Sequence, residues 1–139
     1  MNVYSEEITL STSGEVDMVN ITDNLIGILK QSGMINGIVT IFVVGATGAL
    51  TTIEYEPGLE EDFPAMLERV APKHIKYKHH LTWHDDNGHS HVRASLIGPS
   101  LTIPFVNSKL TLGTWQQIVF LELDTRPRQR TLIAQIMGI

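Results

Sequence analysis

The sequence predicts an α+β fold in which a largely antiparallel or mixed β-sheet is covered by about two helices, in one compact domain over residues 1–139. Helix-type periodicity is confined to the first half of the chain, whereas the second half consists of short strand-like runs. Short connections between these runs favour hairpins, and helices then pack on the resulting sheet. With 42% hydrophobic residues, a chain of 139 residues can bury one substantial core.

The first strand and the first helix have clear boundary signals. Residues 3–11 show the alternation of a half-exposed strand, with apolar residues separated by polar ones. Residues 21–31 then place their apolar side chains on one helical face. Thr22 or Asp23 can cap this helix at its start, and Gly33 follows its end. We expect this helix to cover the sheet.

A second strand pair and a second helix follow. The run Ile38–Val44 contains only β-branched and aromatic residues, which predicts a strand buried on both faces. Leu50–Tyr55 is predicted as the next strand. In the helix expected after it, Pro64 fits the first turn and Pro72 marks the end.

From His91 onward the pattern predicts strands alone. Their expected ranges are 91–97, 101–105, 110–111, 115–124 and 131–137. Asn107 and Ser108 fit a tight turn between two of them.

Composition excludes several classes of function. The formal net charge of −5 argues against a general nucleic-acid surface or an anionic-membrane surface, because cations are too few to neutralise a line of phosphates. The absence of cysteine excludes disulfides and thiolate catalysis. The longest apolar run is too short to cross a bilayer, and the N-terminus shows no signal peptide. A cytoplasmic protein is therefore expected.

A histidine pair is the first candidate for chemistry. His89 and His91 are two residues apart, so on an extended backbone both imidazoles point to one face and can bind one metal ion or phosphate. Groups that could complete or orient such a site lie nearby: His79, His80, Asp85 and Asp86. The alternative is that these histidines lie on a hydrated loop and bond to backbone or water.

Alternating arginines form the second candidate. Arg126, Arg128 and Arg130 would place three guanidinium groups on one face of a regular strand, where they suit phosphate oxygens. A solvated edge or ion pairs at a subunit interface fit the same pattern, and Pro127 limits regular pairing.

Three further residues are candidates with simpler alternatives. Trp115 and Gln116 open a predicted strand and could form a pocket wall and recognise a polar ligand, although a core tryptophan is the simpler interpretation. Glu54, at the end of a predicted strand, is a candidate general base or metal ligand.

The order of motifs in the chain resembles the YjbQ-like family. The motifs are Tyr77-x-His79, Thr82-Trp83, Asp86-Asn87-Gly88, Ser90-His91-x-Arg93-Ala94-Ser95-Leu96, Gly98-Pro99-Ser100-Leu101, Gly113-Thr114-Trp115-Gln116-Gln117-Ile118 and Arg126-Pro127-Arg128-x-Arg130. The resemblance implies a small α+β subunit assembled as a homotrimer, with pockets near subunit boundaries. It also implies thiamine-phosphate synthase activity, recorded for the family as secondary, in which a pyrimidine diphosphate joins a thiazole phosphate and pyrophosphate is released.

Carried over to this chain, the family histidines correspond to His79 and His91. Two positions depart from the family pattern. A His-Thr-Thr-Ala type segment is common after the buried strand, whereas this chain begins that segment with Gly45, and His89 replaces a frequent acidic residue. If the missing imidazole is catalytic in relatives, this protein has lost that activity, changed its chemistry, or recruited His89 or Glu54 instead.

Two functions are therefore expected as alternatives. The first is an enzyme for a small phosphorylated metabolite, in which the three arginines hold phosphate and a divalent ion, zinc or magnesium, offsets the leaving-group charge. His79 or His91 would then transfer protons or bind the metal, with His89 as a third metal ligand. The second is a non-catalytic trimer that binds a metal ion or metabolite, which the departure at Gly45 favours.

Overall fold

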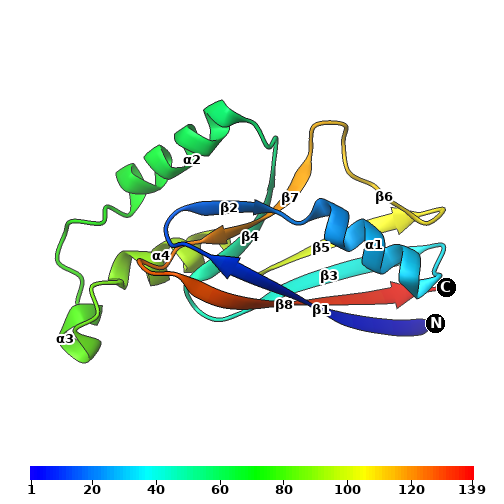
Figure 1. Ribbon diagram of the computed structural model, residues 1–139, viewed down its shortest axis with the longest axis horizontal. Coiled ribbons are helices and arrows are strands. Elements are labelled where there is room, and N and C mark those ends of the chain that lie inside the picture. The colour runs from blue at the N-terminus through cyan, green and yellow to red at the C-terminus, as the bar shows by residue number, and fades with distance from the viewer.

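The computed structural model describes residues 1–139 as two antiparallel sheets and four helices (Figure 1). The larger sheet has the order β1 (Asn2–Thr12), β8 (Arg128–Gly138), β3 (Gly37–Val44), β5 (Ser100–Val106) and β6 (Lys109–Leu110). The smaller sheet has the order β2 (Asp17–Asn20), β7 (Gln117–Glu122) and β4 (Gly48–Ile53). Every strand pair is antiparallel, which confirms the predicted fold class.

The helices lie at two ends of the molecule. Helix α1 (Thr22–Ser32) lies near both chain termini, whereas α2 (Pro57–Val70), α3 (His79–Trp83) and α4 (Gly88–Ile97) gather at the opposite end (Figure 1). The expectation of about two helices accounts for α1 and α2 and missed α3 and α4. None of the four helices combines the length and the apolar character that a membrane crossing requires.

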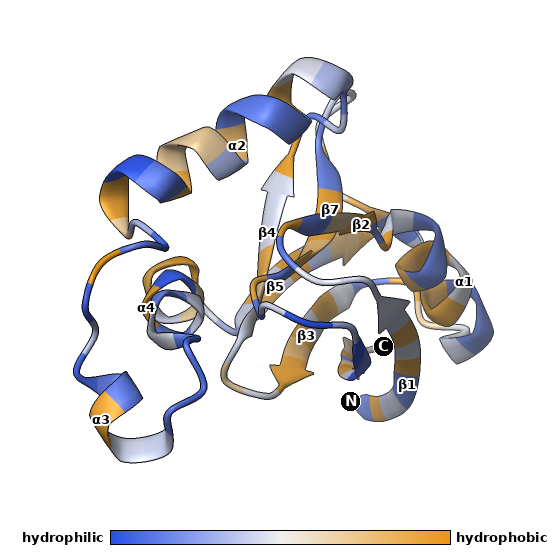
Figure 2. Cartoon of the chain, turned by 60° about the vertical axis from the view of Figure 1, so that its left-hand side comes forward, coloured by the Kyte–Doolittle hydropathy of each residue, from blue (hydrophilic) through white to orange (hydrophobic).

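Two hydrophobic clusters hold the layers together. The larger contains 17 buried residues and joins the inner face of the five-stranded sheet to α1, through Leu25 and Leu29, and to Phe120 of β7. The smaller contains seven and joins the other face of β7 to Leu67 of α2 and Ala94 of α4. The three-stranded sheet is therefore covered on both faces (Figure 2), and β7 is buried along almost all its length.

The prediction that Ile38–Val44 is buried on both faces is wrong. In β3 the side chains of Val39, Ile41 and Val43 are buried, whereas Phe42 and Val44 on the other face are 45% and 53% exposed. No element of the chain packs on that outer face. A run of β-branched residues therefore predicted the strand correctly but not how many of its faces are covered.

The prediction of a strand over residues 91–97 is also wrong, because this segment belongs to α4. Its backbone bonds follow the helical pattern, ending with Gly98 N–H donating to the carbonyl of Ala94 at 2.8 Å. Arg93, Ala94 and Leu96 are good helix formers, and buried Ala94 packs against the smaller sheet. This tertiary packing outweighed the weak strand propensity of the histidines and valine in the segment.

Two elements begin at residues other than those predicted from the sequence. Pro64 lies inside α2 rather than in its first turn, because the helix begins at Pro57. Glu56 caps this start by accepting hydrogen bonds from the backbone N–H groups of Gly58 at 2.9 Å and Leu59 at 2.6 Å. The strand expected from residue 115 begins at Gln117.

Candidate functional site

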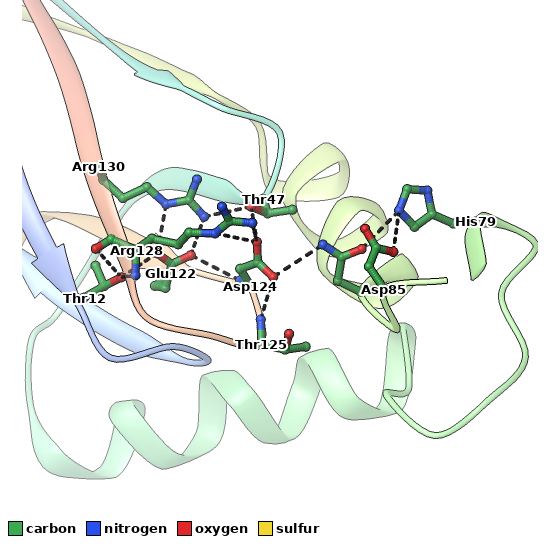
Figure 3. Close-up of polar contacts among 10 residues, drawn as sticks. Thr12, Thr47, His79, Asp85, Glu122, Asp124, Thr125, Arg128 and Arg130 are labelled. Carbon is green, nitrogen blue, oxygen red and sulfur yellow. Dashed lines mark hydrogen bonds and ion pairs between the residues drawn. The ribbon is translucent and has the colours of Figure 1, made fainter. Parts of the chain in front are cut away.

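A pocket of about 470 Å³ opens where the β3–β4 loop, α3, the start of α4 and β8 meet. Ten residues line it: Gly45, Ala46, Thr47, His79, Trp83, Asp85, Asn87, His91, Arg128 and Arg130. Figure 3 shows polar side chains of this histidine–arginine pocket, with the two arginines on one side and His79 on the other.

Arg130 is held in place by a buried ion pair. Its Nε and Nη2 atoms donate to the two carboxylate oxygens of Glu122, at 2.8 and 2.5 Å. Nη2 also donates to Oγ1 of Thr47 at 2.7 Å, and the hydroxyl of Thr12 donates to Glu122 at 2.6 Å. Both charges are buried, and these hydrogen bonds offset the cost of removing the two ions from water.

Gly45 allows the remaining nitrogen of Arg130 to approach the backbone closely. The φ angle of Gly45 is +137°, a conformation that residues with a side chain rarely adopt. A Cβ atom at this position would lie 2.9 Å from Nη1 of Arg130. Glycine at this position therefore permits the guanidinium group of Arg130 to lie close to the β3–β4 loop.

Arg128 is paired with Asp124. Its Nε and Nη2 atoms donate to Oδ2 of Asp124 at 3.0 and 2.6 Å. Burial alone would raise the pKa of Asp124, but hydrogen bonds from Arg128, the backbone N–H of Thr125 and the hydroxyl of Thr47 outweigh it and lower the pKa to about 2. The side chain of Arg128 remains 33% exposed, so part of its guanidinium group is open to the pocket.

Two histidines meet on the opposite side. His79 begins α3 and His91 lies in the first turns of α4, and their ring centroids are 4.4 Å apart. Burial lowers the pKa of His91, and the neighbouring His79 lowers it further, against the opposing influence of Asp124 and Asp85. Both influences favour the neutral imidazole of His91, the form that can act as a proton acceptor.

Asp85 and Asn87 position His79. Nε2 of His79 lies 3.2 Å from Oδ1 of Asp85 and 3.0 Å from the side-chain amide of Asn87. The amide of Asn87 lies between two carboxylates: its nitrogen donates to Asp124 at 3.4 Å, and in the reversed orientation it donates to Asp85 at 2.9 Å. In the reversed orientation neutral His79 accepts from Asn87, while protonated His79 donates to Asp85. Asn87 and Asp85 thus provide a hydrogen-bond partner for His79 in either protonation state.

His89 does not join this site. Residues two apart on a helix are separated by about 200° around its axis, so the shared face expected for His89 and His91, which depended on an extended backbone, is wrong. The side chain of His89 is buried, and its Nε2 atom lies 2.7 Å from the carboxylate of Glu15. Lys73 also pairs with Glu15. His89 is thus a buried partner of Glu15, away from His91.

The remaining predicted residues are distributed elsewhere. Glu54, Trp115 and Gln116 line a separate hollow at the end of β4, where Gln116 donates to the hydroxyl of Thr52 at 3.0 Å. Arg126 precedes β8 and does not line the histidine–arginine pocket. Of the three arginines expected on one face, the structure brings together only Arg128 and Arg130.

Several residues of the site were not among the candidates from the sequence. Thr47, Trp83 and Asn87 line the pocket, and Glu122 and Asp124 hold its two arginines. One signal was available for the last two, because the acidic pair Glu122-x-Asp124 has the same spacing as the basic pair Arg128-x-Arg130. Equal spacing of opposite charges on extended segments is a pattern that permits two adjacent ion pairs.

The donor set does not fit a resident metal ion. The expected ligands were His79, His89 and His91, but His89 is bound to Glu15. No three histidine, aspartate or glutamate side chains are grouped so that they could hold a metal ion. We therefore assign no step at this site to a resident metal.

Comparison with known proteins supports one family. Residues 6–139 match the family described as UPF0047 protein YjbQ-like. A UPF0047 protein from Methanothermobacter thermautotrophicus is 41% identical over 99% of this chain and 94% of its own length. One from Archaeoglobus fulgidus is 37% identical over 94% of this chain and 99% of its own length.

Solved structures agree with this match. A YbjQ-like protein of unknown function from Sulfolobus solfataricus superimposes with a TM-score of 0.94, at 36% identity over 99% of both chains. An uncharacterised yjbq/upf0047 family protein from Clostridium acetobutylicum gives a TM-score of 0.87, at 35% identity over 95% of this chain and 99% of its own. The chain therefore belongs to the YjbQ-like UPF0047 family.

Proposed function

We propose that the histidine–arginine pocket binds a small phosphorylated metabolite and transfers a proton during its reaction. The observation that carries this proposal is the placement of the His79–His91 pair, 4.4 Å apart, in the same pocket as two guanidinium groups. A neutral imidazole beside a second imidazole is suited to general acid–base chemistry, and guanidinium groups are suited to phosphate oxygens.

The anion would be held by the arginine N–H groups that the carboxylates leave free. Asp124 and Glu122 occupy Nε and Nη2 of Arg128 and Arg130, which fixes both guanidinium planes. Nη1 of Arg130 beside Gly45 and the exposed part of Arg128 then face the ligand. Preorganised donors of this kind stabilise charge that develops on a leaving group.

Thiamine-phosphate formation is the specific reaction we propose to test, because the family resemblance implies it. The carbon–oxygen bond to the diphosphate breaks, a carbon–nitrogen bond to the thiazole forms, and pyrophosphate leaves. The arginines would stabilise the pyrophosphate, and a proton shared by the His79–His91 pair would be donated to it. A divalent ion, magnesium or zinc, would arrive with the diphosphate, because the residues present do not form a metal site.

The test is a product assay with the pyrimidine diphosphate and the thiazole phosphate, with and without Mg²⁺. Thiamine phosphate and pyrophosphate would be quantified together. His91→Ala is expected to lower turnover by about 10²- to 10⁴-fold. The matched control His84→Asn removes a histidine outside the pocket and should change turnover by less than about twofold. Unchanged turnover in His91→Ala would contradict the assigned role.

Binding without turnover is the second candidate, and Gly45 is the observation that favours it. The imidazole expected at this position is absent, whereas both guanidinium groups that would hold an anion line the pocket. This candidate predicts that pyrophosphate raises the melting temperature of the protein while no thiamine phosphate is formed.

We also propose that the subunit assembles as a homotrimer, as the resemblance implies. The outer face of the larger sheet supports contact between copies. Its register aligns Val3, Met137, Ile38 and Pro104 in one row across four strands, and Phe42 lies beside Ile133 in another. Light scattering coupled to size-exclusion chromatography tests this assembly: a trimer mass is expected, and Phe42→Glu should shift it toward the monomer.

A further inference from the structure

We infer that Trp83 is a stacking wall of the histidine–arginine pocket and is the residue that recognises the flat ring of a phosphate ester bound there. This inference rests on the proposed function, because the phosphate is assigned to the arginines. It adds the residue that recognises the ring.

Helix α3 directs Trp83 to the pocket. His79 and Trp83 are the first and last residues of this helix, four positions apart, so they lie on one helical face, and both line the pocket. The other pair at this spacing, His80 and His84, forms an edge-to-face contact with ring centroids 5.2 Å apart. Neither His80 nor His84 lines the histidine–arginine pocket.

The indole of Trp83 is available to a ligand. Its residue is 69% exposed, and no residue of α3 is buried, so the ring is not part of either hydrophobic cluster. Ala46 is the only other apolar residue that lines the pocket. A large aromatic surface in an otherwise polar pocket is suited to a planar ring, by stacking or by attraction to a cationic ring.

The two walls define how such a ligand would lie. Arg128 and Arg130 come from β8 on one side, and α3 carries His79 at the opposite end of the polar network (Figure 3). A ligand with its phosphate at the arginines and its ring against Trp83 would therefore reach the α3 side of the pocket, where His79 and His91 meet. The volume of about 470 Å³ lies within the range of small-molecule sites.

Trp115 provides an internal control. It is 73% exposed, like Trp83, but lines the separate hollow beside Glu54. The chain contains only these two tryptophans. Trp115→Phe therefore leaves Trp83 as the single source of indole fluorescence without changing the histidine–arginine pocket.

The experiment compares two probes of similar size, phenyl phosphate and cyclohexyl phosphate, which differ in whether the ring is flat. Dissociation constants would be measured by calorimetry for the Trp115→Phe and Trp83→Leu variants. We expect Trp115→Phe to bind phenyl phosphate about tenfold more tightly than cyclohexyl phosphate, with a change in Trp83 emission. Trp83→Leu should lose this preference and still bind both esters. Circular dichroism would confirm that both variants are folded.

The outcomes separate this inference from the proposed function. Equal affinity for the two esters in Trp115→Phe, or a preference that survives in Trp83→Leu, overturns the stacking role and leaves the phosphate site intact. Binding of neither ester overturns both. Arg128→Gln should weaken the binding of both esters by the same factor, because it removes a phosphate contact and leaves Trp83 unchanged.

Discussion

The two walls of the histidine–arginine pocket are built in different ways. On the sheet side, Arg128 and Arg130 are each bound by a carboxylate that is almost completely buried. On the helix side, α3 contains five residues and none of them is buried. The sheet wall therefore derives its geometry from buried charge pairs, whereas the helix wall depends on a few polar contacts near the surface.

The sheet wall is therefore suited to rigid positioning, and the helix wall to adjustable contact with a ligand. The charges of the sheet wall are already matched within the protein, so they supply fixed donors and little net charge. The helix wall carries His79, positioned by Asp85 and Asn87, together with exposed Trp83. Preorganised donors cost no rearrangement when a ligand binds, and an exposed short helix can adjust to the shape of that ligand.

The largest effect is expected from breaking the buried pair of the sheet wall. Glu122→Gln leaves Arg130 buried without a counter-charge and should lower the free energy of unfolding by about 3–5 kcal/mol. Urea denaturation would measure it, with Glu61→Gln on the exposed side of α2 as the control. A loss below about 1 kcal/mol would show that the sheet wall is not held by this pair.

A pH-dependent effect is expected from the second pair. The pKa of Asp124 is lowered from 3.8 to about 2 in the folded protein, so its ionised form stabilises the fold. That contribution is present above about pH 4 and is lost as the pH falls toward 2. Asp124→Asn should therefore be less stable than the wild type near pH 6, and the difference should narrow near pH 3.

Urea denaturation at several pH values measures this narrowing. Asp62→Asn, at an exposed position of α2, is the matched control and should change the free energy of unfolding by less than about 0.5 kcal/mol. A constant difference between wild type and Asp124→Asn across the same range would contradict the stabilising role of the carboxylate.

The smallest effect is expected on the helix wall. Leu81 of α3 is 74% exposed, so Leu81→Ala should change the free energy of unfolding by less than about 0.5 kcal/mol. A loss of 2 kcal/mol or more, on the order of a core truncation, would mean that α3 is packed against something the isolated chain does not contain. Thermal unfolding at two protein concentrations would distinguish a partner copy from intrachain packing.

The sheet wall was more predictable from sequence than the helix wall. The alternation of Arg128 and Arg130 after a turn identified both guanidinium groups, because alternation along a strand survives in the folded sheet. Their partners Glu122 and Asp124 were missed, since β7 and the start of β8 belong to different sheets that meet only in the tertiary structure.

The helix wall depended on contacts that local patterns do not encode. The segment from His89 to Ile97 has mixed propensity, and its helical state reflects burial of Ala94 against the smaller sheet. Assigning it to a strand placed His89 beside His91. The choice between Trp83 and Trp115 also depends on packing, because both are exposed and only their location distinguishes them.

The position of β8 has a consequence for how the protein is made. This strand is the last in chain order, yet it lies between β1 and β3 and pairs with both along most of their length. During synthesis β1 has no partner until nearly all of the chain has left the ribosome. Such pairing between distant segments slows folding, and the unpaired β1 edge is open to association with other nascent chains until β8 arrives.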